Sequence, residues 1–118
     1  MMKTVADAKA FFENEGLYVS TDKDRSLWIA TNVRDAGNGV LISDHACSLI
    51  KGKQEWTAVF PAEASCTFQI SGALPELAAT ISVVFAKQRV TGDPLRDAFR
   101  QVVPDSERLI ARQVVAHV

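Results

Sequence analysis

The chain has 118 residues, of which 47% are hydrophobic and 23% charged, and its formal net charge at pH 7 is −1. A chain of this length and composition can bury a core of its own, so we expect one domain spanning residues 1–118 that folds without metal or disulfide. Lys and Arg are scattered and balanced by Asp and Glu, which argues against nucleic-acid binding.

The cellular compartment is predicted from three features of the sequence. Acidic residues appear by Asp7 and no apolar stretch of signal-peptide length follows, so a secretory signal is not expected. The uncharged, apolar stretch of residues 77–86 is about half as long as a membrane-spanning helix. The two cysteines, Cys47 and Cys66, suit a reducing compartment. We therefore expect a cytoplasmic protein without membrane contact.

The first predicted element is a helix that begins after Thr4. Thr4 and Asp7 have the spacing of a capping box, and Gly16 stands where a left-handed helix end is favoured. Apolar residues recur on one helical face, at Val5, Ala8, Phe11 and Phe12.

An alternating pattern then predicts strands. Residues 17–21 and 26–32 are expected to pair as a hairpin, and residues 34–39, which include Gly37 and Gly39, are expected to form a loop. The two glycines lack the strand–loop–helix setting of a phosphate-binding loop.

Residues 44–51 fit two structures. Ser43 could cap a short helix that ends before Gly52, or residues 46–50 could be a strand. We favour the strand, because the strand-like residues 55–60 follow closely, and residues 65–72 continue the pattern.

The C-terminal part of the sequence predicts helices. Pro75 with Glu76, and Pro94 after Asp93, have the composition of helix beginnings. Residues 106–118 fit neither period well and are assigned to a helix. The predicted fold is α+β: an N-terminal helix, a four- to five-stranded, mostly antiparallel sheet, and two to three C-terminal helices packed on one face.

The helix that begins near Pro75 is apolar on two sides. At 100° per residue, one side holds Leu77, Ile81, Val84 and Phe85. The opposite side holds Ala79, Val83, Ala86 and Val90. A helix that lies on a sheet and otherwise faces water needs only the first.

Two interpretations of this second apolar side stay open. The C-terminal segments could fold back over it within the same chain. Alternatively it is a contact surface for a second subunit or another protein, since the small residues Ala79 and Ala86 permit close helix approach.

The aromatic residues raise a further possibility. Trp28 and Trp56, with Tyr18, could line a ligand pocket between the sheet and the helix 75–90, although aromatic residues on strands commonly pack across strands.

Residues with catalytic or metal-binding side chains are few. Ser43, Asp44 and His45 are adjacent, but neighbours on a strand do not converge as a hydrolytic triad requires. His45, Cys47, Cys66 and His117 include only one closely spaced pair, so no metal site is expected, and Cys66 is expected to be a buried free thiol.

The sequence therefore predicts a small non-catalytic protein without a cofactor, which acts by contact with a second copy or another protein. A homo-oligomer or an accessory protein of the chaperone or immunity kind fits this description. The alternative is a small-ligand-binding domain.

Overall fold

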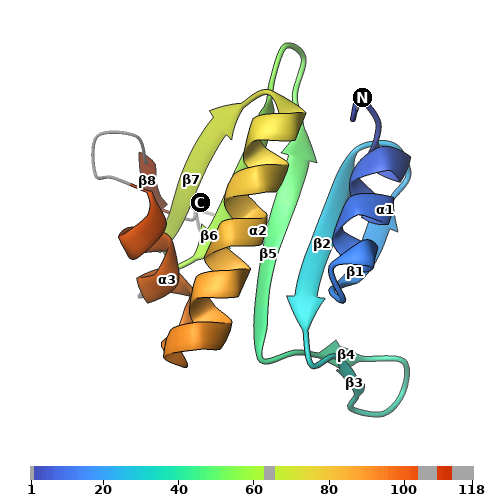
Figure 1. Ribbon diagram of the computed structural model, residues 1–118. Helices are drawn as coiled ribbons and strands as arrows, with labels where there is room; N and C mark the ends of the chain where they lie inside the picture. Colours follow the sequence, from blue (N-terminus) through green and yellow to red (C-terminus); the bar gives the residue numbers. More distant parts are fainter. Residues whose placement is uncertain (1, 63–65, 104–108, 113–118) are drawn as a thin grey trace.

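The computed structural model describes residues 2–62, 66–103 and 109–112, and places three helices against one face of an antiparallel sheet (Figure 1). The first helix, α1 (Val5–Asn14), has the predicted capping box. The Asp7 backbone N–H donates to Thr4 Oγ1, and the Thr4 backbone N–H donates to the Asp7 carboxylate. Gly16 takes a positive φ of 85°, which ends the helix and turns the chain into the first strand.

The main sheet contains six strands in the order β1-β2-β5-β6-β7-β8, and every neighbouring pair is antiparallel. Short turns join most of these strands, as antiparallel pairing allows. The strands are β1 (Tyr18–Asp22), β2 (Ser26–Thr31), β5 (His45–Lys51), β6 (Trp56–Pro61), β7 (Cys66–Gly72) and β8 (Leu109–Arg112).

The ambiguous residues 44–51 form β5, so the strand prediction is confirmed. β5 occupies a central position between β2 and β6, and its backbone pairs on both sides. The buried side chains of Cys47 and Leu49 alternate with half-buried or exposed neighbours, which is the pattern of a strand with one core-facing side.

The helix prediction for residues 106–118 is wrong where the structure describes them. Residues 109–112 form β8, which pairs with β7 from Cys66↔Arg112 to Gln69↔Leu109. The cause is tertiary, because the outer edge of β7 offers unpaired backbone groups to any returning segment. The rest of 106–118 lies outside the described residues.

The chain segment that connects β2 to β5 forms a small second sheet. β3 (Arg34–Asp35) and β4 (Leu41–Ile42) pair at the predicted turn and project from the end of the main sheet (Figure 1). The Asp35 carboxylate accepts a hydrogen bond from the Gly37 backbone N–H, and Gly37 and Gly39 have positive φ. This turn chemistry explains both glycines without a ligand.

Two helices follow the sheet strands β1–β7. α2 (Leu74–Thr91) begins with Pro75 in its first turn and ends at Gly92, which has the left-handed conformation with φ 74°. α3 (Leu95–Val102) follows at once and packs beside α2. The Gln88 side chain donates to the Asp93 backbone oxygen over 3.2 Å and stabilises the connection.

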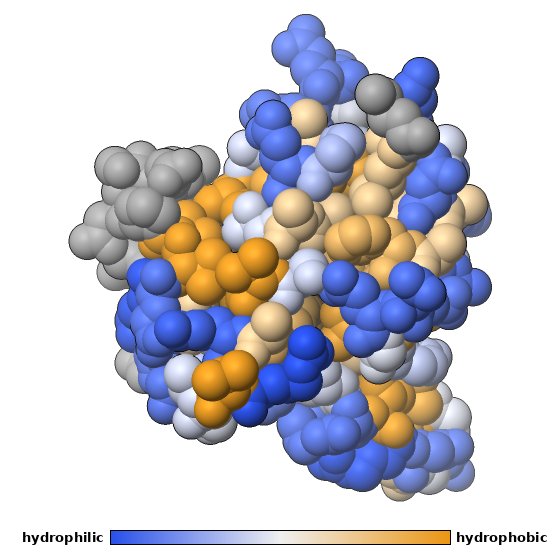
Figure 2. All heavy atoms as spheres, viewed as in Figure 1, coloured by the Kyte–Doolittle hydropathy of each residue, from blue (hydrophilic) through white to orange (hydrophobic). Residues whose placement is uncertain are grey.

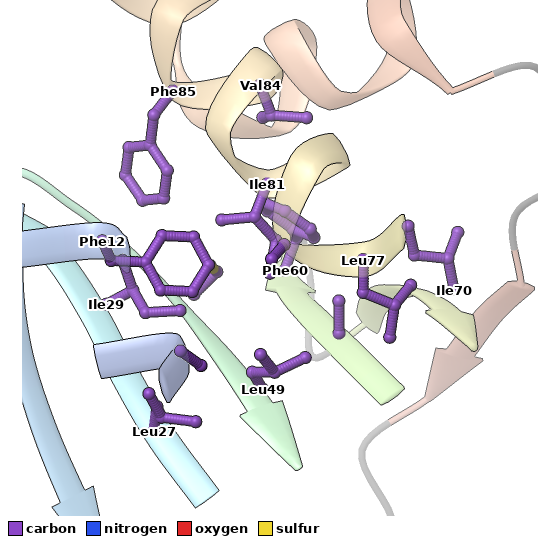
Figure 3. Packing of buried hydrophobic residues seen from close by; sticks show 14 of the residues in the cluster. Phe12, Leu27, Ile29, Leu49, Phe60, Ile70, Leu77, Ile81, Val84 and Phe85 are labelled. Carbon is purple, nitrogen blue, oxygen red and sulfur yellow. The ribbon is translucent and has the colours of Figure 1, made fainter. Parts of the chain in front are cut away.

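The core lies between the helices and the sheet and is filled with aliphatic and aromatic side chains (Figure 3). Phe99 of α3 rests against Phe60 of β6 at 4.7 Å and Phe68 of β7 at 5.4 Å between ring centroids. Phe12 of α1 and Phe85 of α2 are fully buried nearby. These contacts attach all three helices to one face of the sheet.

The predicted architecture is therefore confirmed: α+β class, an N-terminal helix, an antiparallel sheet and two C-terminal helices on one face. β1, β2, β5, β6 and β7 are the five predicted strands, and β8 is a sixth.

Candidate functional site

The two apolar sides of α2 have different environments. Leu77, Ile81, Val84 and Phe85 are buried against the sheet. On the opposite side Val83 is 52% exposed and Val90 is 84% exposed. We call this opposite side, made of Ala79, Val83, Ala86 and Val90, the outer side of α2; Ala79 is exposed and Ala86 is half-buried.

The described C-terminal elements do not cover the outer side of α2. α3 packs against α2, yet Val83 and Val90 stay accessible. Residues 104–108 and 113–118, which the sequence also offered as a cover, lie outside the described residues. Apolar surface gathers near α2 and α3 in the view of Figure 2.

Polar groups fix the position of α2 beside its outer side. The Ser82 hydroxyl and the Glu15 carboxylate form a hydrogen bond that joins α2 to the end of α1. Thr80 donates to the backbone oxygen of Glu76 within the helix. The core therefore fixes the inner side of α2, and the Ser82–Glu15 hydrogen bond fixes its edge, so the position of the outer side is fixed as well.

Trp28 and Trp56 do not share a pocket. Trp56 is 8% exposed and belongs to the core under the helices. The side chain of Trp28 lies on the opposite face of the sheet, away from the helices. The pairing shows why: Trp28 lies opposite Ser48, which lies opposite Val59. Val59 and Trp56 are on opposite faces of β6 because their positions differ by three, an odd number. The two tryptophans therefore cannot line one pocket; a depression of about 200 Å³ between β7 and α2 is lined instead by Ile70, Ser71, Glu76, Leu77, Thr80, Val102 and Val103.

Trp28 instead contacts Tyr18 of the neighbouring strand. The two ring centroids are 5.9 Å apart and the rings meet edge to face. This is the cross-strand aromatic packing that the sequence allowed as the alternative.

In the run Ser43, Asp44 and His45, the aspartate is bound by residues outside the run. The Asp44 carboxylate accepts hydrogen bonds from Asn32 Nδ2 at 2.8 Å and Arg34 Nη1 at 3.0 Å. The hydrogen bond from Asn32, with that from Arg34, lowers the pKa of Asp44, which stays ionised at neutral pH. Among the described residues no hydrogen bond joins Ser43 to His45. Asp44 therefore ties the base of the β3–β4 hairpin together.

The two cysteines, Cys47 and Cys66, are unpaired thiols on different strands. Both are free thiols, and β6 separates their strands, so they are not disulfide neighbours. Cys47 is buried, and this burial raises the pKa of its thiol. Cys66 is half-buried, which corrects the prediction of a buried thiol, because β7 begins at this residue. His117 lies outside the described residues.

The part of the chain that the structure describes contains no group of three or more His, Cys, Asp or Glu side chains able to hold a metal ion. Within the same residues no helix combines the length and apolar character needed to cross a bilayer.

Sequence reasoning missed two exposed surfaces. The first is the β3–β4 hairpin, where Val40, Leu41 and Ile42 are consecutive and all exposed, and which carries an apolar patch at the lower right of Figure 2. The sequence shows the apolar run beside the predicted turn, but only the structure shows that it is exposed, which is what makes such a run unusual.

The second missed surface is the side of the main sheet that faces away from the helices. It is formed by alternate residues of β1, β2, β5, β6 and β7 and is centred on Trp28, Ser48 and Val59, which pair in one row. We call it the open face. An open depression of about 410 Å³ lies on it.

Comparison of the chain with protein-family models, with curated proteins and with solved structures finds no match.

Proposed function

We propose that this protein is non-catalytic and works by protein–protein contact, as a homo-oligomer or an accessory protein. The observation that carries the proposal is the exposed apolar outer side of α2, in which Val83 is 52% and Val90 84% accessible to solvent. A helix whose inner side already fills the core gains little for its own folding from valines on the outer side.

The outer side of α2 has the properties of a helix-packing surface. Ala79 and Ala86 are small and alternate with the two valines along the helix, so a partner helix can approach closely. Lys87 and Arg89 lie beside this side, and a rim of charge around an apolar centre is typical of protein interfaces. The partner we propose is a second copy of this chain.

The test is the molar mass of the wild type and of Val83→Glu across a concentration series. We expect the wild type to associate and Val83→Glu to associate less while keeping the same circular dichroism spectrum. A wild type that is monomeric at every concentration contradicts self-association. A Val83→Glu chain that unfolds shows that the side chain belongs to the fold.

A further inference from the structure

A depression of about 490 Å³ lies where the ends of α1 and α2 meet the sheet, and we call it the end pocket. In Figure 1 both helices end toward the lower part of the molecule, where β2 ends and β5 begins. Gly16 and Gly92 follow the two helices with a positive φ and line the pocket, and they leave it open because they have no side chain. The volume is within the roughly 300–1,000 Å³ of small-molecule sites.

The sheet contributes polar side chains to the end pocket. Thr31 of β2 and His45 of β5 are direct partners in the antiparallel register, on the side of the sheet that carries the buried Ile29 and Cys47. Among the described residues no hydrogen bond engages the His45 imidazole, and the buried Thr31 hydroxyl has no partner. Buried polar atoms without a partner are few in native proteins, so the wall of this pocket is unusual.

The helix α2 contributes Arg89. The Ser82 hydroxyl is hydrogen-bonded to Glu15 at the end of α1, so the edge of α2 that carries Ser82 faces α1. Arg89 follows Ser82 by seven residues and therefore lies on the same edge, two helical turns closer to the pocket. Arg89 is exposed, and no described residue forms a hydrogen bond or an ion pair with its guanidinium group.

The lining of the end pocket holds positive charge without a compensating acid. Among the described residues that line it, Arg89 is permanently charged and none is Asp or Glu. The carboxylates adjacent in sequence to lining residues are hydrogen-bonded to other side chains: Glu15 to Ser82, Asp44 to Asn32 and Arg34, and Asp93 to Gln101. The helix dipoles oppose an anion here, but they act diffusely, whereas a guanidinium makes two direct hydrogen bonds to one carboxylate or phosphate.

We propose that the end pocket binds a small organic anion through Arg89, and that the recognised group is a carboxylate or a phosphate. The planar guanidinium presents paired N–H donors that match two oxygens of either group. The imidazole N–H of His45 supplies a further donor from the sheet. The organic part of the ligand would contact Leu17 and the two glycines. This site is separate from the outer side of α2 and does not depend on self-association.

The expected affinity is modest because Arg89 is exposed. Water and salt screen an ion pair at an exposed guanidinium, so binding depends on several hydrogen bonds rather than on charge alone. We expect a dissociation constant of about 1 mM for a small anion without further matched groups.

The experiment follows the backbone amide signals of the isotope-labelled chain by NMR. Inorganic phosphate and succinate are added separately up to about 20 mM, well above the expected dissociation constant, and sodium chloride keeps the ionic strength constant. In the wild type we expect saturable shifts of the amides of Gly16, Asn32 and Gly92, which line the pocket.

Two variants separate a site from general charge effects. Arg89→Gln removes the proposed anion-binding group and should weaken binding at least tenfold. Lys87→Gln removes a charge of the same sign from the same part of α2, but Lys87 is exposed and does not line the pocket, so binding should be unchanged. Circular dichroism checks that both variants fold.

Each outcome bears on the proposal. Saturation that is lost in Arg89→Gln and retained in Lys87→Gln supports it, and the probe that saturates identifies carboxylate or phosphate as the recognised group. Shifts that increase linearly with both probes overturn it, as does equal weakening in the two variants. The proposed self-association is judged separately by molar mass, so the two proposals fail independently.

Discussion

The neighbouring residues Val83 and Val84 of α2 give a matched test of which helix side is covered. Val84 is fully buried and Val83 is 52% exposed, although both are valines in the middle of the same helix. Replacing each by Ala removes the same atoms and changes helix propensity equally. The difference between the two variants therefore measures burial.

The magnitude follows from the two exposures. Two buried methylene-sized groups contribute about 1.6 kcal/mol, and the cavity at Val84 raises the loss to about 2–3 kcal/mol. At Val83 about half of the transfer energy is at stake and no closed cavity forms, so the better helix propensity of Ala reduces the net change to roughly 0.5 kcal/mol or less. We expect Val84→Ala to be less stable than Val83→Ala by about 2 kcal/mol.

Urea unfolding of dilute samples, followed by circular dichroism, measures this difference. With a slope of about 1–3 kcal/mol per molar urea, the two midpoints should differ by roughly 0.7–2 M. Equal losses at both positions in dilute solution would refute the reasoning, because they would mean that the chain itself covers the outer side of α2.

Three further predictions concern the fold. Thr4→Ala removes the α1 cap and should cost about 1 kcal/mol in urea unfolding. Hydrogen bonds from the backbone of Lys3 and Thr4 lower the pKa of Asp7, so Asp7→Asn should reduce the melting temperature at neutral pH. The difference in melting temperature from the wild type should disappear as the pH falls through the lowered pKa of Asp7 in the folded state. An undiminished difference at low pH would contradict this. In the native protein only one thiol per chain, that of Cys66, should react quickly with a disulfide reagent, and both thiols should react after denaturation. Fast labelling that persists in Cys66→Ser would contradict the burial of Cys47.

Local signals in the sequence were sufficient for the helices. Thr4 and Asp7 mark the beginning of α1, and Pro75 and Gly92 mark the two ends of α2. Each of these residues acts on backbone groups only a few positions away. The inner side of α2 could be predicted for the same reason, since helical periodicity alone places its apolar residues together.

β8 could not be predicted because it depends on a partner distant in the chain. Residues 109–112 have no clear period, and they become a strand by pairing with residues 66–69 of β7. Propensity is a weak guide where a sheet edge provides backbone partners.

The faces of the two tryptophans depend on strand register. Alternation within β2 shows which residues share a side with Trp28, but relating that side to β6 requires the pairings Trp28↔Ser48 and Ser48↔Val59. Those pairings place Trp56 on the opposite side of the sheet, under the helices. The open face was missed for the same reason, because it exists only once the strands are aligned.

The central claim is that this protein functions through contact between copies, and the molar mass of the wild-type chain in solution tests it most directly. As concentration rises to about 1 mM, the account predicts a reversible increase from 12.9 kDa toward twice that value. A molar mass that remains that of one chain over the whole range would contradict it.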